Sequence, residues 1–485
     1  MIFIFVVIAS FTLLLYLHVT RNFHYWKKRN VPYLEPTAFF GNFFPVCSRK
    51  QMIGDFYKTI YNSKRTEYVG FYTFDQPCIL IRDPEIIKNV MIKDFHNFTN
   101  HAVTYSKDDK LSANMLFFTA NSKWKTLRRY FSTTYSSAKL KNMFGTIAER
   151  CDGVIRHVDE VSKNEIDCRD FAMRYGVDAI SACGFGIKAD ALQKESAFFK
   201  MTKQLSEMAT SMAAFFVAPI LVEVFKLKFF ESQAAHYLKD IFVSITEKRK
   251  KCEYVQRGDL IDVLLQLEQD GHSVDENLIG GAAMQFLFAG FETTGTTISF
   301  ALYELAMNRS VQERLREEIR SLCGGKNKIS YEMISQMGYL DMVLKETLRK
   351  YPALPFLDRR SKASYKVPGS DLVIDKGVNV YISSIGLHYD ENYFPNPYKF
   401  DPERFASKQN PWVYMPFGNG PRKCIGSRFA ELTVKTILVK LLLNFRVKPS
   451  PETPYRITFE KNGVLLAPEG HKLYLNFERI HPKCT

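Results

Sequence analysis

A stretch of fifteen residues, PFGNGPRKCIGSRFA at 416–430, sets the tightest constraint on how this chain folds. It holds three glycines, two prolines and one cysteine, Cys424, directly ahead of an apolar run with a helical pattern. Glycine and proline mark backbone positions with special dihedral angles. The segment is therefore predicted to be a tightly turned loop that presents one thiol.

Composition indicates one large globular domain with an N-terminal appendage. The chain has 485 residues, of which 46% are hydrophobic and 24% charged, and it contains no repeat or Ser/Gly linker. The formal charge of +15 suits a merely basic soluble protein, an anionic membrane or an acidic partner, and no nucleic-acid motif accompanies it. Nine scattered cysteines form no CxxC pair, which excludes a disulfide scaffold and favours a reducing compartment.

The first twenty residues, MIFIFVVIASFTLLLYLHVT, carry no Lys, Arg, Asp or Glu. A run of this length spans the hydrocarbon core of a bilayer. A cleaved signal peptide would instead need a basic start and a small-residue cleavage site, and this segment has neither. We expect an uncleaved anchor at 1–20, a basic and proline-bearing tether at 21–41, and a domain at 42–485. Positive charges follow the anchor directly, which predicts that the domain faces the cytoplasm.

The rest of the chain is predicted to be mainly α, with small β-sheets, in an α+β arrangement. EYVGFYTF at 67–74 and CILI at 78–81 read as a hairpin, and the patterning from 122 to 350 is mostly helical. Strand-like pieces return near 365–382 and in the last forty residues. This order does not fit repeated βαβ units.

The segment at 211–230, SMAAFFVAPILVEVFKLKFF, is unusually apolar for a connection between helices. It predicts either a buried core helix interrupted at Pro219 or a loop that dips into the membrane. Periodicity alone does not separate the two.

A long helix is predicted from Asp275 to about Asn308, with a middle, AGFETTGTT at 289–297, that is poor in helix-forming residues. Gly290 would let a flat ligand or small molecule approach the backbone. The Thr293 hydroxyl can bond back to a carbonyl one turn earlier or hold a water, and Glu292 adds a carboxylate beside it. The simpler interpretation is a helix whose threonines only bond back to the backbone.

Two further groups of residues stand out. Glu346 and Arg349 lie at i, i+3 on one helix face and can form an ion pair, with Arg404 of FDPERF as a candidate third member. Exposed, such a pair contributes little, whereas a buried network fixes geometry. Trp124 and Arg128, at i, i+4, can present an indole N–H and a guanidinium to one carboxylate.

The Cys424 thiol has three possible roles: a buried structural group, a nucleophile or a metal ligand. A nucleophile needs a base, and no histidine is near it in the sequence. A ligand to haem iron needs backbone N–H groups turned toward the sulfur. Gly418, Gly420 and Gly426 would permit that turn and let a porphyrin lie against the backbone.

With these residues in place, the segment resembles the haem-binding signature of the cytochrome P450 family, F-x-x-G-x-R-x-C-x-G. The signature positions are filled by Phe417, Gly420, Arg422, Cys424 and Gly426. Other family motifs follow in order: WxxxR at Trp124 and Arg128, AGxETT at Ala289–Thr294, ExxR at Glu346 and Arg349, and PERF at Pro402–Phe405. The residues that fill these motifs are similar to those of animal microsomal members, above all the insect group that handles plant toxins and insecticides.

The resemblance implies a role for each matching residue. Cys424 would be the axial thiolate of haem b and Phe417 would lie near the sulfur. Contacts to the haem propionates would come from Trp124, Arg128, Arg359 and Arg422. His101 stands where family members often carry arginine, so its propionate contact is a departure from the pattern.

On the distal side, the resemblance implies that Thr293 with Glu292 organises protons for dioxygen activation and that Gly290 opens a groove for oxygen. Glu346, Arg349 and Arg404 would hold the proximal side together. Lipophilic substrates would meet mostly apolar residues, each of which could equally be plain core: Leu111, Met115, Phe117, Phe286, Ala289, Leu354, Phe356 and Leu465.

The activity that the resemblance implies is a haem-thiolate monooxygenase of the endoplasmic reticulum membrane. NADPH would supply electrons through NADPH–cytochrome P450 reductase, with cytochrome b5 as a further candidate donor, since no flavin or dinucleotide segment is evident in the sequence. Two rival functions stay open: a reductase-independent isomerase or dehydratase of peroxides, and a haem-binding protein without catalysis.

Overall fold

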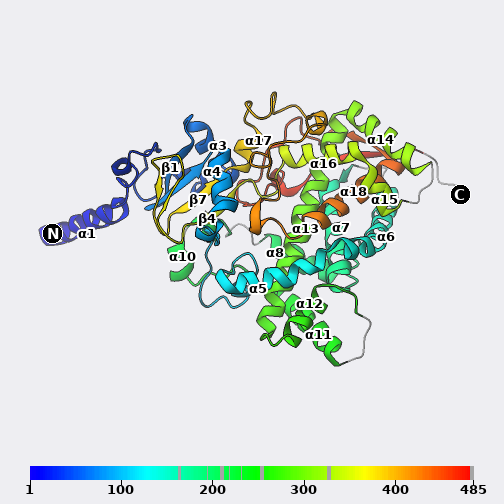
Figure 1. Ribbon diagram of the computed structural model, residues 1–485, viewed down its shortest axis with the longest axis horizontal. Helices are drawn as coiled ribbons and strands as arrows, with labels where there is room; N and C mark the ends of the chain where they lie inside the picture. Colours follow the sequence, from blue (N-terminus) through cyan, green and yellow to red (C-terminus); the bar gives the residue numbers. More distant parts are fainter. Residues whose placement is uncertain are drawn as a thin grey trace.

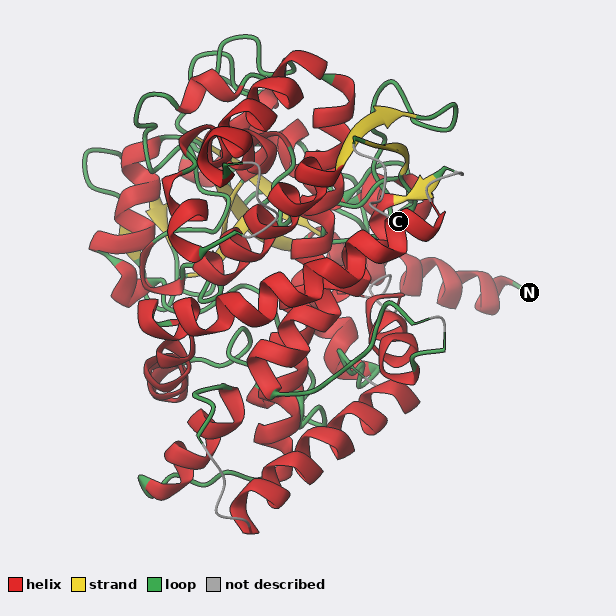
Figure 2. Ribbon diagram, turned by 90° about the vertical axis from the view of Figure 1, so that its right-hand side faces the viewer, coloured by secondary structure: helices red, strands yellow, loops and turns green. Residues whose placement is uncertain are grey.

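The structure is a computed structural model that describes residues 1–485 apart from 162–164, 194, 208–211, 218, 231, 252–255, 325–328 and 481–485. Helices make up most of the body, and short strands form three small sheets (Figures 1 and 2). The prediction of a mainly α fold with small sheets is confirmed.

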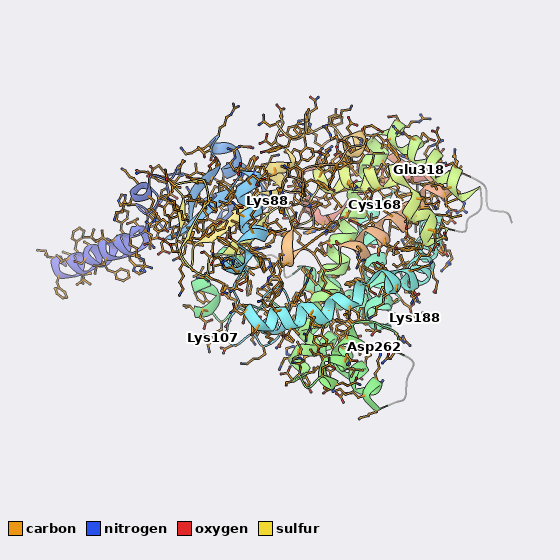
Figure 3. All side chains as sticks on the ribbon, in the orientation of Figure 1. Lys88, Lys107, Cys168, Lys188, Asp262 and Glu318 are labelled. Atoms are coloured by element: carbon orange, nitrogen blue, oxygen red, sulfur yellow. The ribbon has the colours of Figure 1, made fainter. Side chains whose placement is uncertain are left out.

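The first helix, α1 (Ile2–Thr20), projects from the body, and its side chains stand free of it (Figures 1 and 3). None of its residues is buried, and its mean hydropathy is 2.5. At 1.5 Å per residue the helix is about 28 Å long, close to the ~30 Å thickness of a bilayer core. Within the described residues it is the helix long and apolar enough to cross a membrane, which fits the predicted anchor.

The segment predicted as a tether, 21–41, does not hang free but packs on the first sheet. Trp26 is fully buried, and its indole N–H donates to the carbonyl of Phe71 at 3.2 Å. Leu34 N–H donates to Gly70 O at 3.0 Å. These contacts fix the point at which α1 leaves the domain.

The largest sheet has the strand order β1-β2-β7-β4 and lies toward the α1 side of the body (Figure 1). β1 pairs with β2 as the predicted hairpin, β2 runs parallel to β7, and β4 runs antiparallel to β7, which sets Arg359 opposite Val380. The strands are β1 (Tyr68–Thr73), β2 (Gln76–Ile81), β4 (Leu357–Arg360) and β7 (Asn379–Ile382).

Two smaller sheets complete the strand content. One has the order β3-β9-β8 and joins the chain's end to its middle, and the other is a two-stranded pair. Their strands are β3 (Ile166–Asp167), β5 (Tyr365–Lys366), β6 (Val373–Ile374), β8 (Phe445–Pro449) and β9 (Tyr474–Arg479).

The helices of the body surround one long central helix, α13 (Glu276–Met307) (Figure 1). Before it come α2 (Phe44–Cys47), α3 (Ile53–Ser63), α4 (Pro84–Lys88), α5 (Asn121–Ser132), α6 (Ser137–Val161), α7 (Cys168–Phe185), α8 (Ala197–Glu207), α9 (Met212–Val217), α10 (Pro219–Val224), α11 (Gln233–Lys251) and α12 (Leu260–Gln269). After it come α14 (Arg309–Cys323), α15 (Tyr331–Gln336), α16 (Gly338–Lys350), α17 (Ser384–His388) and α18 (Ser427–Asn444).

The central helix α13 begins and ends as predicted. The Asp275 side chain caps it by accepting from Leu278 N–H at 2.8 Å, and Asn308 ends it. The Gly/Thr-rich middle stays helical because it packs closely on α7, where a Cβ at Gly290 would meet Ile180 and one at Gly295 would meet Met173. Tertiary packing thus outweighs the weak intrinsic helix propensity of this stretch.

The apolar segment at 211–230 divides into α9 and α10, with Ser211 and Ala218 outside the described residues. Phe215 and Phe216 are buried, whereas Val224 and Phe225 are each 67% exposed. The segment therefore has a core face and an exposed apolar face, so each of the two expected structures describes part of it.

Candidate active site

The loop that carries Cys424 closes on itself just before α18. Cys424 N–H donates to the carbonyl of Phe417 at 2.9 Å, and helix α18 begins at Ser427. The sulfur consequently lies near the N-terminal end of a helix, where the backbone dipole favours negative charge. This is the tight, thiol-presenting loop that the glycines and prolines predict.

Burial raises the pKa of the Cys424 thiol, but three groups act against that effect. The backbone N–H of Gly426 and the charges of Arg128 and Lys423 each lower it. Such groups stabilise a thiolate. By contrast, Cys151 lies in the core, where burial raises its thiol pKa to about 12.

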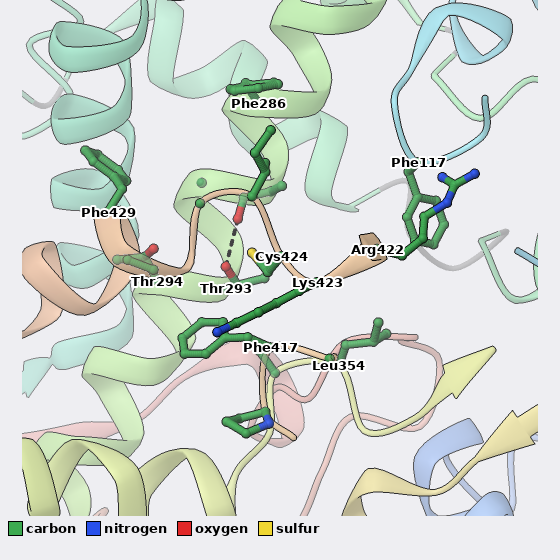
Figure 4. Close-up of a pocket in the computed structure, with 18 of the residues that line it drawn as sticks. Phe117, Phe286, Thr293, Thr294, Leu354, Phe417, Arg422, Lys423, Cys424 and Phe429 are labelled. Atoms are coloured by element: carbon green, nitrogen blue, oxygen red, sulfur yellow. Dashed lines mark hydrogen bonds between the residues drawn. The ribbon is translucent and has the colours of Figure 1, made fainter. Parts of the chain in front are cut away.

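Cys424 borders a cavity of about 310 Å³ between its loop and α13 (Figure 4). Figure 4 shows Cys424 on its loop and Thr293 on α13, two of the residues that border the cavity. Most lining side chains are apolar. They come from α13, α16, α18, β4, the cysteine loop and the loops before α5, after α16 and before β9: Leu116, Phe117, Phe286, Ala289, Leu344, Leu348, Ala353, Leu354, Leu357, Ile425, Phe429, Val434 and Leu465.

The cavity wall also carries more positive than negative charge. Among the described lining residues the cations are Arg128, Arg359, Arg422 and Lys423, and the carboxylate is Glu431. Arg359 is 2% exposed, and its Nε has no hydrogen-bond partner within the described chain. Burial lowers the pKa of this guanidinium to about 10. A buried cation with unused donors calls for an anion in the cavity.

Arg422 joins the cysteine loop to the segment that covers the cavity. Its guanidinium lies 4.3 Å above the ring of Trp124 and donates to the carbonyls of Thr99, Leu116 and Thr119 at 2.9, 3.1 and 2.7 Å. Burial, the main cause, lowers the pKa of Arg422 to about 9. These carbonyls occupy much of its donor capacity, so part of the role of Arg422 is structural.

Trp124 and Arg128 both line the cavity from α5, as their spacing predicts. Neither the Trp124 indole N–H nor the Arg128 guanidinium bonds to a residue in the described part of the chain. Both donors are thus available to a ligand.

The residues present fit haem with a cysteine thiolate ligand. Haem has a flat apolar ring, two propionate carboxylates and an iron that accepts a sulfur ligand, and the wall offers apolar side chains, unpaired guanidinium donors and a thiol. Gly426 supports the fit, because a Cβ there would meet no protein atom closer than one of Tyr135 at 3.9 Å. Protein contacts alone do not explain this glycine, whereas a ring lying against the backbone would.

His101 borders the same cavity but is already engaged. Its Nδ1 lies 3.0 Å from Oδ1 of Asp358, and its ring lies 4.3 Å from that of Phe117. Asp358 was not singled out from the sequence, although it directly precedes the predicted Arg359.

Thr293 lines the cavity, and its hydroxyl donates to the carbonyl of Ala289 at 2.7 Å (Figure 4). The bond back to the helix, one of the two predicted states, is therefore observed. The next residue, Thr294, also lines the cavity, and its buried hydroxyl has no partner within the described residues.

Glu292, predicted to act beside Thr293, does not border the cavity. Its carboxylate is buried and accepts from Arg169 of α7 at 2.6 Å, and Arg169 also donates to Thr296 at 2.8 Å. Adjacent helical residues point about 100° apart, so Glu292 faces α7 when Thr293 faces the cavity. The placement of Glu292 at the cavity is corrected.

Two predicted glycines also have close contacts within the protein. Gly290 lines the cavity as predicted, and a Cβ there would also lie 2.7 Å from Cγ1 of Ile180, so this glycine lets α13 approach α7 closely. Gly420 has φ +71°, and a Cβ there would clash with the carbonyl oxygen of Met91. Gly420 is not among the residues that line the cavity. Its role is to let the cysteine loop turn past the chain.

Of the eight predicted pocket residues, the structure brings five to the cavity: Phe117, Phe286, Ala289, Leu354 and Leu465. The other three are corrected. Leu111 reaches the start of α13 beside Gly280, Met115 is 1% exposed in the core, and Phe356 is fully buried against Tyr57.

Glu346, Arg349 and Arg404 come together beneath the site. Arg349 and Glu346 are fully buried and form a two-bond ion pair at 2.7 and 2.8 Å, and Arg404 Nε lies 3.4 Å from the same carboxylate. Arg349 also donates to the carbonyls of His388 and Pro397, each at 2.8 Å. The pair is a buried network and not a surface contact.

Sequence reasoning missed His388, which links this network to the cysteine loop. Its Nδ1 bonds to the carbonyl of Arg349 at 3.0 Å, and its Nε2 accepts from Met415 N–H at 3.2 Å. Arg169 was missed as well, since it lies 123 residues from Glu292 and no local pattern pairs them.

Comparison with known proteins agrees with this site. The cytochrome P450 family model matches residues 31–475. Cytochrome P450 6j1 of Blattella germanica is 37% identical over 490 residues, which cover 98% of this chain and 97% of the relative. Cytochrome P450 6B7 of Helicoverpa armigera is 35% identical, covering 96% of each chain. Probable cytochrome P450 6a13 of Drosophila melanogaster is 34% identical, covering 95% of this chain and 96% of the relative.

The match over nearly the full length, together with the cysteine loop and the cation-lined cavity, shows that the chain belongs to the cytochrome P450 family of haem-thiolate monooxygenases.

Proposed function

We propose that this monooxygenase inserts one oxygen atom into lipophilic substrates while anchored in the endoplasmic reticulum membrane, with the predicted site residues in the roles below. The observation that carries the proposal is one cavity that joins the Cys424 thiol, unpaired guanidinium donors and apolar walls. Bound haem would supply the iron at which dioxygen is reduced and cleaved, favoured by electron donation from a thiolate ligand.

Cys424 would hold the iron, and the surrounding backbone would keep its sulfur ionised. The Gly426 N–H and the charges of Arg128 and Lys423 are placed to stabilise the thiolate. Phe417, which also lines the cavity, would exclude water from the sulfur.

Trp124, Arg128 and Arg359 would bind and orient the propionates, because all three line the cavity; the Nε of Arg359 has no partner within the described residues, while its Nη1 donates to the carbonyl of Asp358 at 2.7 Å. Arg422 would contribute charge and hold the cysteine loop against the covering segment through its three carbonyl bonds.

Thr293 would hold a proton donor on the distal side. Its hydroxyl releases the Ala289 carbonyl by a side-chain rotation and can then donate into the cavity. Glu292 would act only indirectly, by fixing this turn of α13 against Arg169, since its carboxylate is engaged at 2.6 Å.

The walls suit a substrate that is uncharged and apolar. Phe117, Phe286, Ala289, Leu354 and Leu465 offer aromatic and aliphatic contacts. Most of the charged groups of the wall are cations, which propionates would use.

Electrons would come from NADPH through NADPH–cytochrome P450 reductase, with cytochrome b5 as a second donor. Exposed cations on the elements around Cys424 form the basis of this proposal: Lys125, Arg129, Lys423 and Arg428. A basic face attracts an acidic partner and makes association dependent on salt.

The predicted division into an anchor at 1–20, a tether at 21–41 and a catalytic domain at 42–485 completes the proposal. The free apolar helix α1 would span the membrane with the domain in the cytoplasm, since positive charge follows it. The exposed Val224 and Phe225 of the α10 region would touch the same membrane.

The test is incubation of purified protein, reductase and NADPH under ¹⁸O₂ with a panel of lipophilic compounds, read by mass spectrometry. We expect one ¹⁸O atom in a product that requires both reductase and NADPH. Product formation from lipid hydroperoxides without reductase, and none with it, would contradict the proposal and favour isomerase chemistry.

A further inference from the structure

His101 is held rigidly at the edge of the cavity by two contacts. Nδ1 lies 3.0 Å from the Asp358 carboxylate, and one face of the ring lies against Phe117. Asp358 is itself fixed, because its other oxygen accepts from Ala102 N–H at 2.5 Å. The side chain of His101 is 12% exposed, at the cavity.

The carboxylate determines which nitrogen of His101 carries a proton. Asp358 accepts, so Nδ1 must donate, and in a neutral ring Nε2 is then an acceptor. A second proton turns Nε2 into a donor. Nε2 bonds to no residue in the described parts of the chain, so this change alters what the ring offers to a ligand in the cavity.

The charges that face His101 come from two elements. Asp358 and Arg359 lie on β4, and Arg422 lies on the turn before Cys424. Burial lowers the pKa of His101, Asp358 opposes this, and the two arginines add to the lowering. Burial raises the pKa of Asp358, but His101, Arg359 and the Ala102 N–H outweigh it and hold that carboxyl ionised.

An anion bound at Arg359 and Arg422 would raise the pKa of His101. It would cancel the repulsion from both guanidinium groups and add an attraction of its own, and each effect favours the imidazolium. Arg128, another arginine at the cavity, keeps its charge across neutral pH and cannot respond in this way.

We propose that His101, positioned by Asp358, is a proton-dependent contact for a carboxylate of bound haem. Binding of that carboxylate draws one proton from solvent onto the ring, and its Nε2–H donates to the carboxylate. The enzyme therefore retains its haem more firmly at low pH than at high pH. This inference rests on the proposed haem site, and what it adds is that the contact made by His101 depends on pH through its bond to Asp358.

The test measures haem loss from the full-length holoprotein in detergent, by transfer to excess apomyoglobin, from pH 6 to pH 9. We expect the wild-type dissociation rate to rise by about tenfold or more, because each unit between the pKa values of two states is a factor of ten in affinity. His101→Arg carries a permanent charge and should lose this rise. His236→Gln, a change at an exposed histidine of α11, should keep it.

Resonance Raman bands of propionate bending give a second readout that does not depend on turnover. They should titrate with pH in the wild type and stay constant in His101→Arg. If His101→Arg retains no haem, His101→Gln serves instead, and it should lose haem at every pH about as fast as the wild type does at pH 9.

Parallel pH profiles for the wild type and His101→Arg, or a His101→Gln profile as steep as the wild type, would overturn the inference. A protein that binds haem with a thiolate spectrum but shows this result fails the inference alone. A protein that binds no haem at all fails the proposed function.

Discussion

Acidification should destabilise the fold through one buried histidine, His388. This residue is fully buried, and both ring nitrogens are used. Nε2 accepts from Met415 N–H, so Nδ1 must carry the proton that is donated to the carbonyl of Arg349. A second proton on Nε2 would face the Met415 N–H and break the contact that anchors the cysteine loop.

The magnitude follows from the pKa of the folded state. Burial, with the nearby Arg349 charge, lowers the pKa of His388 from 6.5 to about 3. The unfolded chain binds a proton below about pH 6.5 and the folded chain does not, so the free energy of unfolding falls as the pH falls through that window. At 1.4 kcal/mol per pH unit, His388 alone costs about 2 kcal/mol between pH 7 and pH 5.

The assay compares urea unfolding midpoints of the wild type, His388→Gln and His236→Gln at pH 7 and pH 5. Glutamine retains a hydrogen-bond acceptor and does not titrate. We therefore expect His388→Gln to lose about 2 kcal/mol less than the wild type on acidification, although the substitution itself should lower stability at pH 7. The exposed His236→Gln should behave as the wild type. If His388→Gln loses as much stability as the wild type between the two pH values, the tautomer argument is wrong.

Three further predictions concern the site and its supports. Thr293→Ala should keep the haem spectrum but lower the ratio of product to NADPH consumed by about tenfold or more, with hydrogen peroxide formed instead; an unchanged ratio excludes its proton role. Arg349→Ala removes the two-bond partner of the buried Glu346 carboxylate and leaves the longer Arg404 contact, and it should cost about 3–5 kcal/mol of unfolding free energy, against about 0–1 for the exposed control Lys448→Ala; equal losses would show that the network contributes nothing. Gly290→Ala should cost about 1–3 kcal/mol because its Cβ meets Ile180, and Ile180→Ala in the same chain should recover part of it; a Gly290→Ala protein as stable as the wild type would refute the close helix contact.

The sequence predicts features whose information is local. The glycines and prolines around Cys424 specify a turned loop within a few residues, and the cap at Asp275 fixes where α13 begins. The Glu346–Arg349 pair follows from helical spacing alone, although its complete burial does not.

Features that depend on distant partners could not be predicted in the same way. Arg169, on another helix, determines which way the Glu292 side chain points. Ile180, also on another helix, leaves no room for a side chain at Gly290. Likewise Phe356, an apolar residue at a plausible pocket position, turns into the core because Tyr57 offers an aromatic neighbour there. Apolar character alone does not tell a cavity wall from a core.

The most direct test of the account is the absorption spectrum of the reduced protein with carbon monoxide, recorded for the wild type and for Cys424→Ala. We expect the red-shifted Soret band of thiolate ligation in the wild type and its loss in Cys424→Ala, while Cys151→Ala, a change at a buried core thiol, retains the band. A Cys424→Ala protein that still shows the red-shifted band would contradict the assignment of Cys424 as the iron ligand.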